Sequence, residues 1–402
     1  MPDLRRVSSD ARSVGISHFL TKIIRLLRKV QPSARREHPV VLSCRLSGFC
    51  LTPVGFLTFL LIPMSSTQKV TMSKRTAAAA LSLIAATLGL AACGSSSGGA
   101  KHLTLVAYST PQGVFEKLIP AFEETPAGKG VAFSQSYGPS GEQSRAVANG
   151  LHADVVNFSL EPDVERLVKA GLVSASWNNN ATHGFVTDSV AVIIVRKGNP
   201  KHITGWSDLV KPGVQVLTPN PFTSGGARWN VMAAYGAQLK EGKTPAEAQT
   251  YLKALFHNVV SQDSSARNAL QTFLAGRGDA LIDYEDEAIT DQKKGASIEY
   301  VIPKDTILIQ NPIAVVGSGA SAAEAQKFVE YLLSPAGQVI WVAKGYRPVI
   351  AGVAGASRFP TPPGLFTIDS LGGWKTVTKQ FFEPETGIVT KIEQSLGVST
   401  AK

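Results

Sequence analysis

The sequence predicts an α/β fold of two lobes, each a mostly parallel sheet flanked by helices, joined by two crossing segments. Two observations lead to this prediction. Strand-like and helix-like runs alternate after residue 100, which is typical of parallel sheets with helices on both faces. Residues 93–402 are also long enough for two lobes rather than one. We expect the chain to build part of one lobe, then a second lobe, and then to return.

The first lobe begins with three strand-like runs, each followed by a helix-like run. Short apolar runs bounded by Gly and Pro indicate strands, and longer amphipathic runs that end near glycine indicate helices. The strands are expected at 103–107, 131–135 and 155–158, and the helices at 113–124, 141–149 and 161–170.

A second α/β set follows the apolar stretch 190–196, VAVIIVR, which reads as a strand. The remaining helices are expected at 227–238, 244–256, 263–276, 324–333 and 335–343, and the remaining strands at 280–284, 298–302 and 306–316.

The two crossings between the lobes are placed near Val192 and Thr306. Residues 101–192 and 306–402 then form the first lobe with a C-terminal extension, and residues 193–305 form the second. Ligands of such folds bind between the lobes, beyond the carboxyl ends of the strands.

The net charge of +10 comes entirely from the N-terminal part of the chain. Residues 1–92 carry 13 Lys and Arg against 3 Asp and Glu, whereas residues 93–402 carry 27 of each. The folded body is therefore neutral, and its charge does not indicate a nucleic-acid partner.

Residues 72–92 have the pattern of a lipoprotein signal peptide. A basic start is followed by the apolar run 77–90 and by two small residues before Cys93. The ending 90–93, LAAC, resembles a bacterial lipobox, which implies a lipid on Cys93 and a protein held on the periplasmic or cell-surface side of the membrane. Residues 93–100 then form a flexible tether. The alternative is an uncut membrane anchor, for which the run is short.

Residues 1–71 are interpreted as a misassigned start, because a signal peptide normally begins at its own methionine. Met72 or Met64 is then the first residue. The alternative is a genuine N-terminal extension.

Several kinds of chemistry are excluded by residue usage. Cys44, Cys50 and Cys93 are the only cysteines, so the body after Cys93 has no disulfide and no Cys-based metal site. The histidines after residue 93 lack the spacing of metal ligands. Nucleophile-elbow and P-loop motifs are absent. The sequence therefore predicts no metal, no cofactor and no enzyme activity.

The acidic residues Asp283, Glu285, Asp286 and Glu287 suggest metal-bound acid chemistry at first sight. We interpret them instead as a strand end and the solvated start of a helix, where carboxylates are favoured by the helix dipole.

Four short loops follow predicted strands and open helices with Ser or Gly. The most informative is 219–230, PNPFTSGGARWN, in which Ser224 is placed as N-cap and Gly225 and Gly226 leave backbone N–H groups uncovered. The others contain Ser109, Ser140 in a capping box with Gln143, and a serine cap before Ala266. Together these loops can converge on one oxyanion.

Five motifs resemble the periplasmic sulfate-binding proteins of ABC importers. They are PNPFTSGGARWN, SYGPSGEQ at 136–143, VRKGNPK at 195–201, DLVKPGV at 208–214 and LFTID..GGW at 365–374. The likeness runs from about residue 103 to about 381. It implies a type II periplasmic-binding-protein-like fold and a dehydrated sulfate clamped between the lobes by N–H groups and neutral side chains. It also implies a monomer that delivers its ligand to an ABC permease, without a cofactor.

The resemblance carries seven ligand positions onto this chain. Backbone N–H groups are expected to donate from five of them, and a hydroxyl from Ser224. The seven are Ser109, Ser140, Ser224, Gly225, Gly226, Ala266 and Tyr284.

Two of these positions depart from the family pattern. Ser109 stands where relatives often have Asp, and Tyr284 where they often have Trp. A pocket with donors only rejects an anion that still carries a proton, such as phosphate near neutral pH. A phenol can accept as well as donate, so Tyr284 either softens that rejection or simply donates as an indole would; we favour the second interpretation.

Arg228 and Arg267 each come shortly after one of these loops. They either raise the local potential or, in the interpretation we prefer, pair with carboxylates such as Asp263 or Glu285.

The function predicted from these observations is capture of sulfate and its delivery to a permease. A binding protein for thiosulfate, molybdate or tungstate is the alternative, and an enzyme acting on oxyanion esters is a weaker one.

Overall fold

The computed structural model describes residues 101–400. The chain divides into two units, Met1–Thr87 and Leu88–Lys402, and every described residue belongs to the second. The interpretations of 1–71, of the signal peptide at 72–92, of Cys93 and of the tether at 93–100 fall outside the described residues and stay predictions.

The nine strands of the described part form one hydrogen-bonded sheet. Eight of them follow the order β2-β1-β3-β9-β4-β7-β5-β6, and β8 lies off this path, paired to β4. Its first part contains β1 (Lys101–Tyr108), which pairs in parallel with β2 (Val131–Gly138) and β3 (Val155–Asn157). β9 (Leu308–Val315) closes this part antiparallel to β3.

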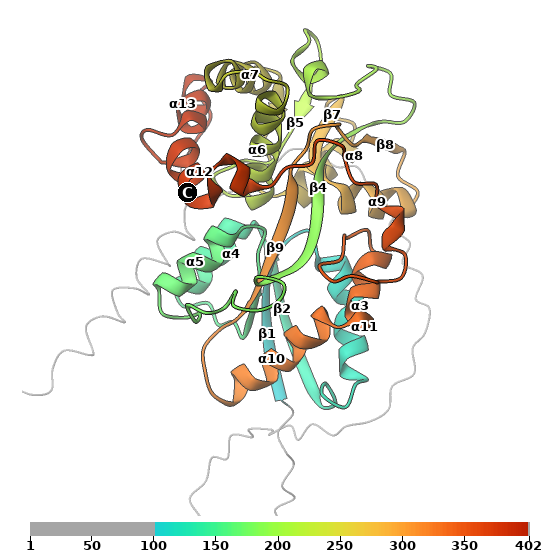
Figure 1. Cartoon of the computed structure of the whole chain (residues 1–402), viewed down its shortest axis with the longest axis vertical. Coiled ribbons are helices and arrows are strands. Elements are labelled where there is room, and N and C mark those ends of the chain that lie inside the picture. Colours follow the sequence, from blue (N-terminus) through green and yellow to red (C-terminus); the bar gives the residue numbers. More distant parts are fainter. Residues whose placement is uncertain (1–100, 401–402) are drawn as a thin grey trace, which may run out of the picture. The chain divides into compact units, whose positions relative to one another are not determined.

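Five helices pack around this first group of strands (Figure 1). They are α3 (Gln112–Glu123), α4 (Ser140–Ala148), α5 (Glu161–Lys169), α10 (Ala320–Leu333) and α11 (Pro335–Ala343). On one face, aromatic side chains dominate the core: Phe115, Phe122, Phe328 and Trp341 are fully buried. The T-shaped contact of Phe115 with Trp341, at 5.4 Å between ring centroids, joins α3 to α11.

The second group of strands contains β5 (Val216–Leu217), β6 (Val259–Ser261), β7 (Ala280–Tyr284) and β8 (Ile298–Val301). β5 pairs in parallel with both β6 and β7. The helices of this part are α6 (Gly225–Lys240), α7 (Pro245–His257), α8 (Ala266–Leu274) and α9 (Glu285–Lys293). Short 3-10 turns occur at η1 (Trp206–Val210), η2 (Ala356–Arg358) and η3 (Ile368–Leu371).

Two long strands connect the groups. β4 (Phe185–Arg196) pairs with β9 through its first half and with β7 and β8 through its second half. Figure 1 shows β4 and β9 running through the middle of the described part. The α/β fold of two lobes is confirmed. The antiparallel pairings of β4 and β9 make both groups mixed rather than purely parallel.

Of the two predicted crossing points, Val192 lies inside β4, and Thr306 lies two residues before β9. The exact lobe boundaries stay predictions.

The C-terminal segment forms two helices that the sequence does not predict, α12 (Gly373–Phe382) and α13 (Ile388–Ser395). Phe381, Phe382 and Val389 are buried in the same core as α6 and α7. These helices therefore pack with elements of the second group, although the segment was assigned to the first lobe and a C-terminal extension.

Helix α6 is buried on nearly all sides, from Gly225 to Gln238. Small residues on α6 allow the elements packed against this helix to come close. A Cβ added to Gly236 would lie 2.3 Å from the ring of Phe366, so only glycine fits there.

No helix within residues 101–400 is both long and apolar enough to span a bilayer.

Candidate functional site

The seven predicted ligand positions lie where strands end and helices begin. Ser109 follows β1, Ser140 opens α4, Ser224 caps α6, and Gly225 and Gly226 open α6. Ala266 opens α8, and Tyr284 ends β7.

The start of α6 is built as an anion site. Ser224 is the N-cap, and its Oγ accepts from the N–H of Ala227 at 3.3 Å. The N–H groups of Gly225 and Gly226, in the first turn, have no acceptor within the helix. Because the Ser224 oxygen accepts, its hydrogen stays available to donate outward. The three groups therefore point donors and the positive end of the helix dipole in one direction.

Both glycines are required by close neighbours. A Cβ on Gly225 would lie 2.6 Å from Cβ and Oγ of Ser159, and one on Gly226 would lie 2.8 Å from Cε2 of Tyr284 and 3.5 Å from Cβ of Ala266. These contacts place the start of α6 directly against the end of β7 and the start of α8.

Ser140 is held by its own side chain. Its hydroxyl donates to Oδ2 of Asp163 at 2.6 Å and accepts from the N–H of Ser159 at 3.0 Å. The hydroxyl hydrogen is thus committed, which leaves the backbone N–H as the donor that the resemblance implies.

The capping box predicted for Ser140 and Gln143 is wrong. Pro139 is the N-cap of α4, and the N–H of Gln143 donates to the Pro139 carbonyl. The competing donor is the N–H of Ser159, from which the Ser140 oxygen already accepts at 3.0 Å, and the local sequence does not reveal this contact.

Tyr284 is fully buried at the end of β7. Its hydroxyl lies 2.6 Å from Oγ of Ser159, and its ring lies 6.2 Å from that of Tyr108. Burial raises the pKa of Tyr284 well above its ordinary value, so the phenol stays protonated and able to donate.

Ser159 is a residue of this site that the sequence analysis missed. It lies between β3 and α5 and joins Ser140, Gly225 and Tyr284. The signal was present, because Ser159 directly follows the predicted strand 155–158, but the family resemblance carried no ligand position onto it.

Ser109 is connected to the other predicted ligand positions through contacts of its neighbours in the chain. The ring of Tyr108 contacts that of Tyr284, and the carbonyl of Thr110 accepts from Arg267 at 2.8 Å. The structure thus links Ser140, Ser224, Gly225, Gly226, Ala266 and Tyr284 directly or through Ser159, and Ser109 through its neighbours. Their role as ligand donors stays a prediction.

The two arginines behave differently. Arg267 forms an ion pair with Glu287 at 2.8 Å, so pairing was predicted with the wrong carboxylates. Arg228 instead donates to the carbonyl of Pro221 at 2.8 Å and stacks on Phe382. The pairing predicted for Arg228 is therefore wrong, because the C-terminal helices supply an aromatic partner.

The acidic segment at the start of α9 is buried rather than solvated, and its predicted exposure is wrong. Asp283, Glu285, Asp286 and Glu287 are each at most 3% exposed. β7 is a central strand of its group and α9 begins directly after its last residue, so the first turn of α9 faces the core. Glu285 pairs with Arg347 at 2.7 Å, and Asp286 accepts from the Ser189 hydroxyl at 2.7 Å. Within residues 101–400, no three His, Cys, Asp or Glu side chains are arranged to hold a metal ion.

The pKa of Asp286 is raised to about 8, chiefly by burial and also by the neighbouring Glu287. The carboxyl therefore keeps its proton in the folded state up to about pH 8, whereas the unfolded chain loses it near pH 4. Between these values unfolding releases a proton, so the Asp286 contribution to stability falls as pH rises.

We predict that Asp286→Asn makes the free energy of unfolding less dependent on pH between pH 5 and pH 8. The amide still accepts from Ser189 but cannot ionise. Between pH 5 and pH 8, the free energy of unfolding should fall by on the order of 4 kcal/mol more in the unchanged protein than in the variant. Urea unfolding at both pH values measures this, and equal slopes for the two proteins would contradict it.

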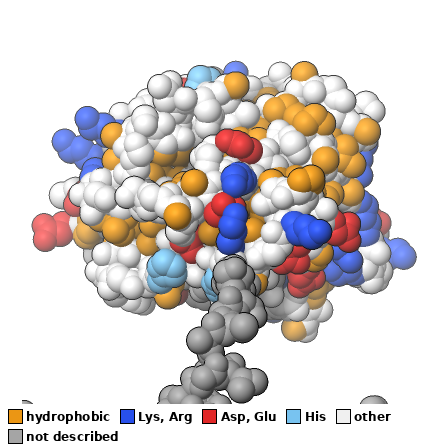
Figure 2. Space-filling view, turned by 90° about the horizontal axis from the view of Figure 1, so that it is seen from below, with side chains coloured by type: hydrophobic (Ala, Val, Ile, Leu, Met, Phe, Trp, Pro, Cys, Tyr) orange, Lys and Arg blue, Asp and Glu red, His pale blue; other side chains and the backbone are white. Residues whose placement is uncertain are grey.

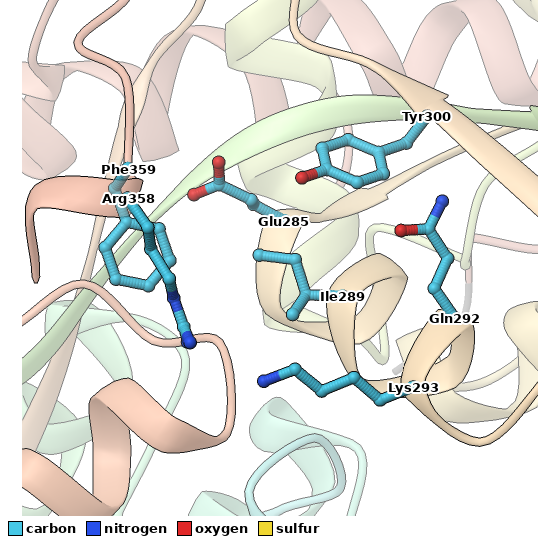
Figure 3. A pocket seen from close by; sticks show the side chains of 7 residues that line it. All are labelled: Glu285, Ile289, Gln292, Lys293, Tyr300, Arg358 and Phe359. Atoms are coloured by element: carbon cyan, nitrogen blue, oxygen red, sulfur yellow. The ribbon is translucent and has the colours of Figure 1, made fainter. Parts of the chain in front are cut away.

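A hollow of about 380 Å³ opens beside α9 (Figure 3). Four of its residues belong to α9, and Arg358 and Phe359 face them across it. The cations there already have partners: Lys293 donates to the Ala343 carbonyl at 2.8 Å, and Arg358 to the Val342 carbonyl. None of the seven predicted positions lines this hollow.

Comparison with known proteins agrees with the fold and with the sequence motifs. The family of bacterial extracellular solute-binding proteins matches residues 103–347. A sulfate-binding protein of Synechococcus elongatus is 39% identical over 330 residues, which covers 78% of this chain and 94% of that protein. A thiosulfate-binding protein of Pseudomonas aeruginosa is 34% identical, covering 73% of this chain and 94% of its own.

A solved structure shows the same relationship. The sulfate-binding protein SubI from Mycobacterium tuberculosis superposes with a TM-score of 0.68 and 42% identity, covering 70% of this chain and all of that one. The relationship inferred from the motifs is thus confirmed over most of the chain. The chain belongs to the bacterial extracellular solute-binding proteins, together with the sulfate-binding proteins that it resembles.

Proposed function

We propose that this protein captures sulfate at the junction of α4, α6, α8 and the end of β7, and delivers it to an ABC permease. The observation that carries the proposal is the convergence of neutral donors on the start of α6. Gly226 lies against both Tyr284 and Ala266, and Gly225 lies against Ser159, which holds Ser140. The names of the relatives support sulfate as the ligand.

Neutral donors suffice for such a ligand. A hydrogen bond to a charged group contributes about 1.5–3 kcal/mol. Several of them, less the cost of closing the lobes, reach about −8 kcal/mol, which corresponds to a micromolar dissociation constant. The cation Arg267 is already paired with Glu287 at 2.8 Å, so it is not a free charge at the site.

Isothermal titration calorimetry of the protein from Ser95 onward tests the proposal. We expect one sulfate per chain with a dissociation constant in the micromolar range or below. Thiosulfate, molybdate and phosphate are titrated under the same conditions. Absence of binding to all four anions would reject the proposal.

Thiosulfate is the second candidate ligand, because a thiosulfate-binding protein is also a relative over most of the chain. Thiosulfate is a tetrahedral dianion that one set of donors can hold, and the same titrations rank it against sulfate. A thiosulfate affinity well above that of sulfate would favour this alternative.

We also propose that the protein acts without catalysis, as a monomer on the extracytoplasmic side of the membrane, anchored through Cys93. Support comes from the lipobox-like ending before Cys93 and from relatives that are named as binding proteins. On the face that Figure 2 shows, Lys and Arg side chains alternate with Asp and Glu. In the described part, two lysines share one carboxylate, since Lys101 and Lys327 both pair with Glu324.

A further inference from the structure

Ser159 occupies the point where the two groups of strands meet around the proposed sulfate site. Its side chain is buried between Gly225 of α6 and Tyr284 of β7. Its Oγ lies 2.6 Å from the Tyr284 hydroxyl oxygen, a distance at which one of the two must donate to the other.

The backbone of Ser159 is held on both sides. Its N–H donates to Oγ of Ser140 at 3.0 Å. Its carbonyl accepts from the indole N–H of Trp229 at 2.8 Å and from the side-chain amide of Asn311 at 3.3 Å. The hydroxyl is therefore aimed at Tyr284 by a fixed backbone.

Asn311 also holds Ser159 in place. Its Oδ1 accepts from the Thr187 hydroxyl at 3.4 Å, which turns the NH₂ group toward the Ser159 carbonyl. The Ser159 hydroxyl is thus the side-chain group that meets the phenol oxygen of Tyr284.

A phenol has one hydrogen to give and an oxygen that can accept. When the Ser159 hydroxyl donates to that oxygen, its capacity to accept is used. Its own hydrogen is then left to donate elsewhere, and the ring edge beside the hydroxyl lies at the start of α6, where a Cβ on Gly226 would be 2.8 Å from Cε2. Tyr284 in this state offers the site what an indole offers, one donor and no acceptor.

We infer that Ser159 is a specificity-determining residue, whose hydroxyl donates to Tyr284 and thereby excludes oxyanions that still carry a proton. The inference rests on the proposed function. Sulfate carries no proton near neutral pH and needs donors only. Hydrogen phosphate carries one, and its O–H finds no acceptor at a phenol whose oxygen is already occupied.

Ser159→Ala removes this donor and frees the phenol oxygen of Tyr284 to accept. Calorimetry of the purified protein with sulfate and with inorganic phosphate at pH 7 is the test. We expect sulfate affinity to change by less than about threefold, and the phosphate-to-sulfate affinity ratio to rise by about tenfold.

The double variant Ser159→Ala/Tyr284→Trp is the rescue. An indole can only donate, and the loss of Oγ leaves room for the larger ring. The affinity ratio should return to that of the unchanged protein. Thr390→Val is the matched control, because it removes one buried hydroxyl in α13, where Thr390 donates to the Glu383 carbonyl at 2.8 Å. Its ratio should not change.

Failure of the inference and failure of the proposed function give different results. If the unchanged protein binds sulfate but Ser159→Ala leaves the ratio unaltered, or weakens both anions equally, Ser159 is structural and the inference is wrong. If the unchanged protein binds no sulfate, the proposed function fails and the inference with it. Should the alanine variant not fold, Ser159→Cys repeats the test with a side chain that is only a weak donor.

Discussion

Replacing Gly226 with leucine is expected to abolish sulfate binding. Already the first atom of the new side chain would lie 2.8 Å from Cε2 of Tyr284 and 3.5 Å from both Cβ of Ala266 and Oγ of Ser224. Real Cβ atoms do not come so close to a ring carbon, so either the ring or the helix start must move. The site loses its geometry in both cases, and we expect the affinity to fall at least a hundredfold, about 2.7 kcal/mol or more.

Gly113→Leu is the matched control for this change. Gly113 lies in the first turn of α3, where an added Cβ would meet nothing within 4 Å. Calorimetry of both variants, with circular dichroism to show that each is folded, measures the difference. A folded Gly226→Leu protein that binds sulfate normally would mean that the site is misplaced.

The second large effect is expected at Arg347, which holds a buried carboxylate. Its Nε lies 2.7 Å from Oε2 of Glu285, and its Nη2 lies 3.0 Å from Oε1, a bidentate pair. Nη2 also donates to the Pro360 carbonyl at 2.9 Å. Arg347→Leu leaves Glu285 buried without its cation, which costs about 3–5 kcal/mol of unfolding free energy.

Removing both charges should restore most of this loss. In Arg347→Leu/Glu285→Leu no charge stays buried without a partner, and buried pairs replaced by apolar residues are often neutral in stability. Lys327→Ala is the control, because its partner Glu324 also pairs with Lys101 at the surface and such pairs contribute under about 1 kcal/mol. Urea unfolding measures all three. A double variant no more stable than Arg347→Leu would show that the loss comes from packing.

Much of the secondary structure could be predicted because it depends on short-range pattern. The start of α6 follows from Ser224 as a cap and two glycines, and β4 extends the apolar run 190–196 to Phe185–Arg196. β5 has only two residues, Val216–Leu217, too few for any periodicity, and its place depends on its neighbours β6 and β7.

The alternation of strands and helices and the family motifs that point to an oxyanion could be predicted, because each depends on residues close together in the chain. The neutral charge of the folded body follows from composition alone. The burial of the acidic start of α9 and the bond from Ser140 to Asp163 are set by the tertiary structure. So is the contact of Ser159 with Tyr284, 125 residues away. Burial and hydrogen-bond partners depend on which distant segments the sheet brings together, and no local pattern contains that information.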